Sequence, residues 1–377
     1  MSDDILDMLK RSVEGYVAKD PERVRRHRGV FPYHSVDAWD EMAGQGWLSI
    51  LVPEALGGLG LGLAPAAEVA RVMGQAAQIE PFTAVGVFAA ALLAGTGHPT
   101  AADDLAMLMA GTQLVGVAWQ NERGSIELSA CGVRASTTEG KILLNGVTRF
   151  AAPAAADAFV VLARCDAGLG LYWVPSDAPG VTVVSELAAD GSALARIELR
   201  DAECRGELSG GAQAEQVLTR ALDMSLVVAA SELLGVMDGA LAMTLEFLRT
   251  RRQFGVAIGS FQVLQHRAVD LWMQREITEA AVNAAVSLLE SGADTPEQGA
   301  AASGAKARAA QAALYVCGQS VQLHGAIGFA DEYGLGLYLN RSLSLGAWLG
   351  GAAQHRARFA SYTPLDVRDA TASAVAA

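Results

Sequence analysis

The spacing of apolar residues changes twice along this chain of 377 residues, and that change constrains the fold more than any other feature. Residues 1–111 carry apolar side chains at helical spacing, whereas residues 112–208 carry them in alternation or in short runs between turn residues. Long helical stripes return in residues 209–377. Because strands and helices do not alternate, the pattern excludes a doubly wound sheet and an α/β barrel.

The predicted fold class is therefore α+β with three domains. We expect an N-terminal α-helical domain over residues 1–111, a central β-barrel or sandwich over 112–208, and a C-terminal four-helix bundle over 209–377. Inside the central domain, Asn145 followed by Gly146 predicts a hairpin turn, because this pair tolerates positive φ angles.

Charge and cysteine content narrow the functional classes. A formal net charge of -13 at pH 7 argues against general nucleic-acid binding and against attachment to anionic membranes. The apolar run at residues 84–94 is too short to span a bilayer, and the acidic N-terminus is unlike a signal peptide. Four widely spaced cysteines without a CxxC pair favour reduced thiols rather than a zinc site. We therefore expect a cytoplasmic protein without a metal.

The first informative motif is RTRRQFGVAIGSFQVLQH, at residues 249–266. It lies where a long predicted helix ends, so a solvated cationic cluster at a helix C-terminus is one interpretation. The Gln253-Phe254-Gly255 that follows Arg251 favours a binding site instead. A guanidinium suits a pyrophosphate, and a glutamine beside an aromatic ring suits a planar heterocycle with hydrogen-bonding edges.

The second motif is QLHGAIGF, at residues 322–329, which follows an alanine-rich predicted helix. Glycines such as Gly325 and Gly328 permit close approach of the backbone to a ligand. A simple helix C-cap is the alternative interpretation, because a glycine commonly ends a helix.

Together these motifs resemble the flavin-binding signatures of the acyl-CoA dehydrogenase family. The string R-x-Q-F-G…F-Q-x-x-Q-H is close to the first family signature. It begins at Arg251, and its last part runs from Phe261 and Gln262 to His266. Gln322, Gly325 and Gly328 match the second, while Ala326 replaces one of its glycines.

The resemblance implies that the cofactor is FAD and the substrate an acyl-CoA thioester. It places Arg251 at the FAD pyrophosphate, with Gln253 and Phe254 beside it, and the Gln322 loop at the adenine end. In the family both motifs reach the flavin of a neighbouring subunit, so the resemblance implies a homo-oligomer or a complex with a related chain.

The resemblance covers nearly the whole chain but weakens in the central domain. Phe150 stands where the family has an aromatic residue that covers the flavin. Thr148 replaces a frequent lysine, and Ala152 lacks the hydroxyl group that the family offers to flavin N5. The sequence therefore predicts fewer flavin contacts from this domain.

The family reaction needs a carboxylate that removes the α-proton while a β-hydride passes to flavin N5. No aspartate or glutamate occurs from Tyr333 through Leu365. Gly350 and Gly351 occupy the loop positions where the family usually has the base. A minority of the family places the base on the first bundle helix, where this chain has Ser225. Asp223 lies two residues away, which is about 200° around a helix.

Three interpretations remain open. The leading one resembles bacterial steroid-degrading and dicarboxylate-degrading systems, in which this chain would contribute FAD contacts and a partner acyl-CoA dehydrogenase subunit would supply the base. A homomeric enzyme with a displaced base is the second, with Asp223 and Glu122 as candidates. The third is a flavin-dependent oxidase or monooxygenase on the same fold, which needs no α-proton abstraction. The acyl group is not identified by the sequence.

Overall fold

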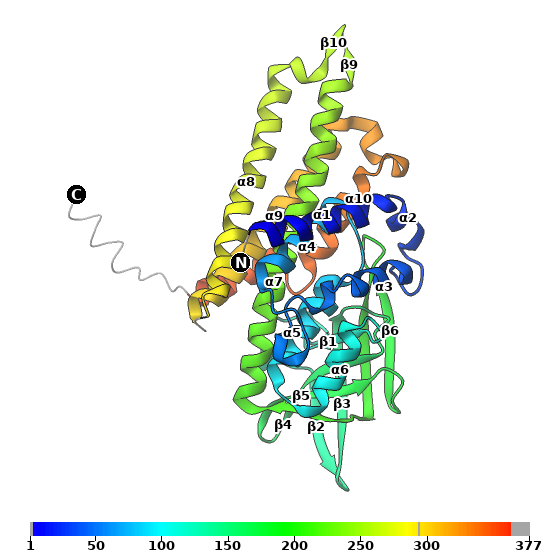
Figure 1. The fold of residues 1–377 in the computed structure, drawn as a ribbon, viewed down its shortest axis with the longest axis vertical. Helices are drawn as coiled ribbons and strands as arrows, with labels where there is room; N and C mark the ends of the chain where they lie inside the picture. Colours follow the sequence, from blue (N-terminus) through cyan, green and yellow to red (C-terminus); the bar gives the residue numbers. More distant parts are fainter. Residues whose placement is uncertain (1–2, 293–294, 363–377) are drawn as a thin grey trace, which may run out of the picture.

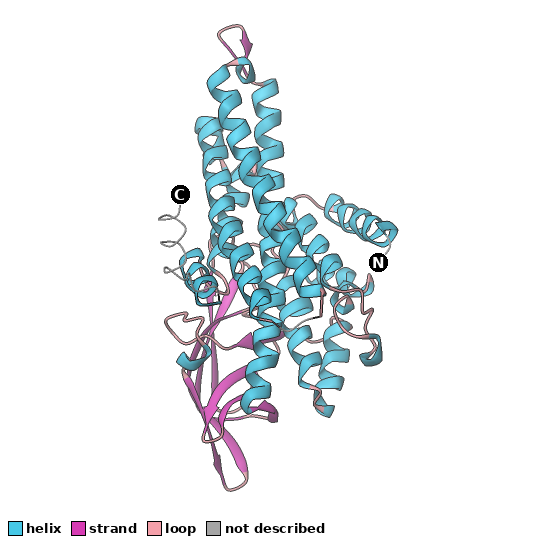
Figure 2. Ribbon diagram, turned by 90° about the vertical axis from the view of Figure 1, so that its left-hand side faces the viewer, coloured by secondary structure: helices cyan, strands magenta, loops and turns pink. Residues whose placement is uncertain are grey.

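The computed structural model describes residues 3–292 and 295–362. Helices form both ends of the described chain and a sheet forms its middle (Figure 1, Figure 2). The α+β class, with an N-terminal helical part, a central sheet and a C-terminal helical part, is confirmed. The domain limits at residues 111 and 208 stay predictions.

The N-terminal helices pack around an apolar core that includes Trp39, Met42 and Trp47. Ser35 begins one of them as an N-cap, since its side chain accepts a hydrogen bond from the amide of Ala38. The helices are α1 (Asp3–Lys19), α2 (Arg23–His27), α3 (Val36–Gly44), α4 (Leu63–Gln75), α5 (Ala90–Thr96) and α6 (Pro99–Met109), with the π-helical segment η3 (Thr83–Ala89) before α5.

The central strands form one sheet in the order β6-β7-β3-β2-β4-β5-β8, and β1 pairs in parallel with β4. Successive side chains point to opposite faces, so Val160 and Trp173 join the core shared with the helices while Val161 and Val174 pack in a second core with β7. The strands are β1 (Val115–Ala118), β2 (Val133–Thr138), β3 (Lys141–Ala151), β4 (Ala158–Cys165), β5 (Gly168–Pro175), β6 (Val181–Leu187), β7 (Ala193–Glu203) and β8 (Gly206–Gly210).

The hairpin turn predicted at Asn145 and Gly146 is wrong. Both residues lie inside β3, where the register with β7 shifts between Leu144 and Gly146. The turn that joins β2 to β3 is Glu139-Gly140, and both residues have positive φ there. Gly146 has its positive φ at an irregularity within a strand. Glycine adopts positive φ at such positions as readily as it does in turns.

The C-terminal part is a bundle of long helices joined at one end by a short hairpin (Figure 1). Helix α7 is long and apolar enough to cross a membrane, but 83% of its apolar window is buried within the protein, as in a core helix. The elements are α7 (Gly211–Thr250), β9 (Arg252–Gln253), β10 (Val256–Ala257), α8 (Gln262–Glu290), α9 (Pro296–His324), η6 (Gly325–Phe329), η7 (Asp331–Tyr333), α10 (Leu335–Ala347) and α11 (Ala352–Tyr362).

Candidate functional site

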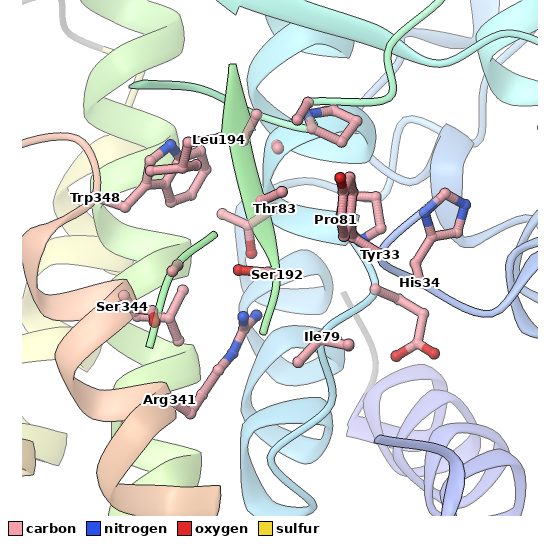
Figure 3. Close-up of a pocket in the computed structure, with 18 of the residues that line it drawn as sticks. Tyr33, His34, Ile79, Pro81, Thr83, Ser192, Leu194, Arg341, Ser344 and Trp348 are labelled. Carbon is pink, nitrogen blue, oxygen red and sulfur yellow. The ribbon is translucent and has the colours of Figure 1, made fainter. Parts of the chain in front are cut away.

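Side chains from the N-terminal helices, the sheet and the bundle enclose a small cavity where these parts meet (Figure 3). Its volume is ≈ 60 Å³, which is room for a few water molecules and well below the roughly 300 Å³ at which pockets for organic ligands begin. In Figure 3, Trp348 and His34 lie at opposite ends of the cavity, and Arg341 points from α10 towards Ser192.

Arg341 is the centre of a buried ion cluster beside this cavity. Its guanidinium donates to Glu232 of α7 (Nε–Oε1, 3.0 Å) and to Asp190 in the β6–β7 turn (Nη1–Oδ2, 2.7 Å). The other oxygen of Glu232 accepts from the Thr83 hydroxyl at 2.9 Å, and Ser192 donates to Asp190 at 2.7 Å. The cluster therefore joins α10, α7, η3 and the sheet through bonds that burial strengthens.

Glu80 lines the same cavity without a partner. Its residue is 2% exposed, and no described donor reaches either carboxyl oxygen with hydrogen-bond geometry. Burial raises the pKa of Glu80, an effect that the nearby amides of Glu80 and Ile79 and the charges of Arg23 and Arg341 oppose without cancelling it. An unpaired carboxyl of this kind favours its neutral, protonated form.

The loop between α10 and α11 contains Gly350, one of the two positions where the family resemblance places a base. Gly350 has a φ of +111°, and a Cβ there would stand 2.7 Å from Ile126 Cγ2 and 2.9 Å from His355 Nε2. Real Cβ atoms do not approach other atoms so closely. Ile126, on the segment that precedes β2, therefore occupies the space that a side chain at position 350 would need.

Gln354 fastens the two segments together. Its Nε2 donates to the Gly124 carbonyl at 3.0 Å, and its Oε1 accepts from the Gly351 amide at 3.0 Å. A Cβ on Gly351 would meet no atom within 4 Å. The two glycines are thus different: position 350 is filled by a neighbour, whereas position 351 is open.

Lys306 of α9 binds the backbone of this loop through hydrogen bonds. The lysine is fully buried, and its Nζ donates to the carbonyl oxygens of Leu345 (2.9 Å), Gly346 (3.1 Å) and Gly350 (3.2 Å). Burial lowers the pKa of Lys306 to about 7. An ammonium has three donors, so it satisfies all three carbonyl groups left unpaired near the end of α10.

Asp223 and Glu122, the candidates for a displaced base, both form ion pairs. Asp223 pairs with Arg358 of α11 (Oδ1–Nη1, 2.6 Å), and Glu122 pairs with Arg196 of β7 at 2.8 Å. Ser225, at the minority position of the base, is buried and donates its hydroxyl hydrogen to the Ala221 carbonyl at 2.7 Å. None of the three lines the small cavity.

Asp223 instead faces a second, more open cleft of ≈ 800 Å³. This cleft lies between the loop at residues 60–63, helix α7 and the ends of α8, α9 and α11. Arg220 and Tyr362 line it beside Asp223. Its size falls within the range of pockets that hold small molecules and cofactors.

On the sheet side, the residues expected near the flavin are turned to internal packing. Phe150 adopts a φ of +66°, which is unusual for an aromatic residue, and its ring lies against Gly124 and 4.8 Å from the Arg149 guanidinium. Thr148 is buried and donates to the Gln120 carbonyl at 2.8 Å. Its hydroxyl is therefore committed within the protein.

At the distal end of the bundle, the first motif forms the β9–β10 hairpin and its flanks. Phe254 and Gly255 make the turn, and Phe254 has a φ of +53° while its side chain is 92% exposed. Arg251, Gln253 and Gln262 are also exposed, and Arg251 has no ion pair among the described residues. Positive φ at both Phe254 and Gly255 is what the two-residue turn between Gln253 and Val256 requires, and this turn presents the Phe254 side chain to solvent.

The second motif lies near the same end of the bundle. The ring of His324 stacks on Phe247, near the end of α7, with 4.3 Å between centroids. Gln322 is exposed and Gly325 has open space around it, as a ligand-facing pair would require. Gly328 is different, since a Cβ there would lie 2.8 Å from the Val321 carbonyl. Packing alone explains that glycine.

The structure separates the predicted cofactor residues into two groups. The hairpin with Arg251, Gln253 and Phe254 is at one end of the molecule, and the sheet, of which β3 is part, is at the other (Figure 1). Arg251 and Phe150 therefore belong to different parts of the fold.

The two groups also differ in how well they fit FAD. The distal group offers an uncommitted guanidinium, exposed amides and an open glycine, which suit a pyrophosphate and an adenine presented by another chain. On the sheet side, Ala152 has no hydroxyl group and the Thr148 hydroxyl is committed to the Gln120 carbonyl. The exposed residues of the distal group therefore fit the phosphates and the adenine of FAD.

Sequence reasoning missed Glu80, Arg341 and Lys306. Each carried a weak signal, namely an isolated charge among apolar or small neighbours, such as Glu80 between Ile79 and Pro81. The packing of Ile126 against Gly350 had no local signal, because it joins segments far apart in the sequence.

The sequence and the fold are both similar to those of known proteins. FadE27, an acyl-CoA dehydrogenase of Mycobacterium tuberculosis, is 28% identical over 322 residues, which cover 84% of this chain and 85% of that one. A variant of the Tcur3481-Tcur3483 steroid ACAD is 26% identical, with a TM-score of 0.86 over 96% of this chain and 98% of that one. The ChsE4-ChsE5 complex of Mycobacterium tuberculosis shares the fold at 24% identity, with a TM-score of 0.88 over 97% and 98%.

Two family models match as well. The N-terminal domain of acyl-CoA dehydrogenases matches residues 2–103, and their C-terminal domain matches residues 215–361. These matches include both distal motifs and the Gly350 loop. The chain belongs to the acyl-CoA dehydrogenase family.

Proposed function

We propose that this chain is the flavin-contributing subunit of a heteromeric acyl-CoA dehydrogenase, and that a second, related chain supplies the catalytic carboxylate. The absence of an acid at positions 350 and 351 carries the proposal, and Ile126 occupies the space that a side chain at position 350 would need. Asp223 and Glu122 are tied to arginines and do not replace the base.

In this assignment the distal end of the bundle holds the cofactor of the neighbouring chain. Arg251 would bind the pyrophosphate through charge-assisted hydrogen bonds, and Gln253 would contact the edge of the ring system. Gly325 would let the backbone approach the adenine. FAD, once bound, supplies the acceptor for the β-hydride, while the α-proton leaves to a carboxylate of the second chain.

The apolar outer surface of the bundle is an argument for a second chain. On α8 the side chains of Trp272, Met273 and Ile277 are each about half exposed, as are Leu314 and Tyr315 on α9. Soluble monomers rarely expose so many large apolar side chains on neighbouring helices. A related chain with a similar bundle is the occupant that we propose for this surface.

The structural neighbours support the heteromeric form of the proposal. The Tcur3481-Tcur3483 steroid ACAD and the ChsE4-ChsE5 complex each combine two different chains by name. Steroid or lipid catabolism is accordingly the context that we propose for this chain.

The experiment that tests this assignment compares two neighbouring arginines in the complex purified after co-expression with its genomic neighbour. Arg251→Ala should lower the FAD content, because it removes a charge-assisted contact, without a matching loss of thermal stability. Arg252→Ala is the matched control, since it removes an exposed cation from the same hairpin. Full FAD content in Arg251→Ala, or an equal loss in both variants, would refute the distal cofactor site.

A second candidate function, an active homomeric dehydrogenase with a displaced base, gains one observation from Glu80. This carboxyl is buried, unpaired and faces the cavity between the domains, and its pKa is raised. A carboxyl with a raised pKa is a stronger base, once ionised, than an exposed carboxylate. Turnover by the chain alone that disappears in Glu80→Gln would favour this candidate over the heteromeric one.

A further inference from the structure

The loop after α9 presents two large apolar side chains to solvent. Ile327 is 44% exposed and Phe329 is 78% exposed, and both lie in η6, directly after Gly325. The single 3-10 turn η7 and Gly334, which has a φ of +88°, lie between η6 and α10, so the loop has few helical hydrogen bonds of its own. Its position must therefore be set by contacts with other elements.

One such contact is a carboxylate held by two arginines. Arg28 meets Asp331 in a two-bond arrangement, with Nη1–Oδ1 at 2.8 Å and Nη2–Oδ2 at 2.5 Å. Arg25 adds a contact from Nη1 to Asp331 Oδ2 at 3.2 Å and one from Nη2 to the Glu332 carbonyl at 3.4 Å. Isolated surface ion pairs contribute little, but a two-bond arginine pair inside a network is the exception.

The arginines themselves are attached to rigid parts of the protein. Arg25 is on α2, and Arg28 ends that helix as its C-cap. The next residue, Gly29, donates its amide hydrogen to the Gly191 carbonyl at 2.7 Å, which ties this end of α2 to the β6–β7 turn. At the other end of α2, Arg23 is buried over the ring of Tyr16 at 4.2 Å. The Asp331 loop is thus anchored to the sheet and to α1, not to the bundle alone.

We propose that Asp331, held by Arg28 and Arg25, is the positioning residue that fixes the Gly325–Phe329 loop for the cofactor of the neighbouring chain. The inference rests on the proposed function, since it assigns a task to the same distal site. Asp331 itself does not touch the cofactor in this account. It acts by ordering Gly325 and Phe329 before binding, so that binding does not have to order them.

The test is a fluorescence titration of FAD into the flavin-depleted complex purified with its genomic neighbour. Asp331→Asn should weaken FAD binding by roughly fivefold to tenfold, and the melting temperature should stay within about 3 °C of the wild type. Asp331→Glu keeps the charge and should recover part of the affinity. Asp166→Asn, an exposed aspartate in the turn at the far end of the sheet, is the matched control and should change neither quantity.

A double-mutant cycle distinguishes positioning from general destabilisation. If the two residues act together, Arg28→Met should weaken FAD binding in the wild type and add little in the Asp331→Asn background. Wild-type affinity in Asp331→Asn, in a complex whose FAD binding is still lost on Arg251→Ala, would overturn the positioning role and leave the proposed function standing. A wild-type complex that binds no FAD would overturn both.

Discussion

Ile126 Cγ2 stands 2.7 Å from the point that a Cβ on Gly350 would occupy, so the isoleucine and a side chain at position 350 exclude each other. The hydrogen bonds of Gln354 to Gly124 and Gly351 hold the two segments in this arrangement. The packing therefore leaves no room for a side chain at position 350, whereas position 351 stays open.

This packing predicts different outcomes for two carboxylate insertions. Gly350→Glu must adopt a φ of +111° and displace Ile126, so it should lower the free energy of unfolding by about 2–4 kcal/mol. Gly351→Asp enters open space and should cost less than about 1 kcal/mol. Urea denaturation monitored by circular dichroism measures both. Equal losses would contradict this explanation of the loop, and Gly350→Ala, which already carries the overlapping Cβ and the positive φ, should show a large part of the loss.

Glu80 predicts a pH-dependent stability. Its folded-state pKa is raised above the ordinary value of 4.5, so the folded protein keeps a proton that the unfolded chain releases. Stability should therefore fall as the pH rises from 4.5 through the raised pKa. Glu80→Gln removes this titration and should raise the melting temperature at neutral and higher pH, with little effect below pH 4.5. A constant difference between the two proteins across that range would contradict the prediction.

Replacing Lys306 by a residue of similar volume should destabilise the folded protein strongly. Lys306→Met keeps most of the side-chain length but leaves the carbonyls of Leu345, Gly346 and Gly350 without their donor. We expect the free energy of unfolding to fall by about 3 kcal/mol or more, because each unpaired buried carbonyl costs about 1–3 kcal/mol. Chemical denaturation is the measurement. A Met variant as stable as the wild type would show that water or rearrangement satisfies these groups.

Asp223 predicts a structural effect rather than a catalytic one. Its carboxylate and the Arg358 guanidinium are both about nine-tenths buried, so Asp223→Asn leaves a buried cation poorly compensated. We expect a loss of about 1–3 kcal/mol in stability, while partner-dependent turnover at low temperature stays within twofold of the wild type. Loss of turnover at unchanged stability would instead identify Asp223 as a displaced base.

The order of helices and strands was predictable because apolar spacing is a local property of the chain. The exposed cations and amides of the distal motifs were also predictable, because such side chains are not needed in a packed core, whereas Gly328 is explained by packing. The turn at Asn145 and Gly146 was not predictable in this way, since Gly146 uses its positive φ inside β3 and Glu139-Gly140 makes the turn. Local turn chemistry was outweighed by the pairing of β3 with β7.

The buried polar groups could not be predicted from the sequence for a different reason. Arg341, Glu232 and Asp190 come from three elements far apart in the chain, and their contact exists only after packing. The absence of an acid near Gly350 was visible in the sequence, but the side chain that fills its place was not.

The most direct test of the central claim is acyl-CoA-dependent dye reduction by this chain purified alone, with FAD added, and by the same chain co-purified with a neighbour that carries an intact base. The account predicts turnover by the pair and a rate lower by at least about 10²–10⁴-fold for the chain alone, the usual contribution of a general base. Turnover by the isolated chain at a rate close to that of the pair would contradict it.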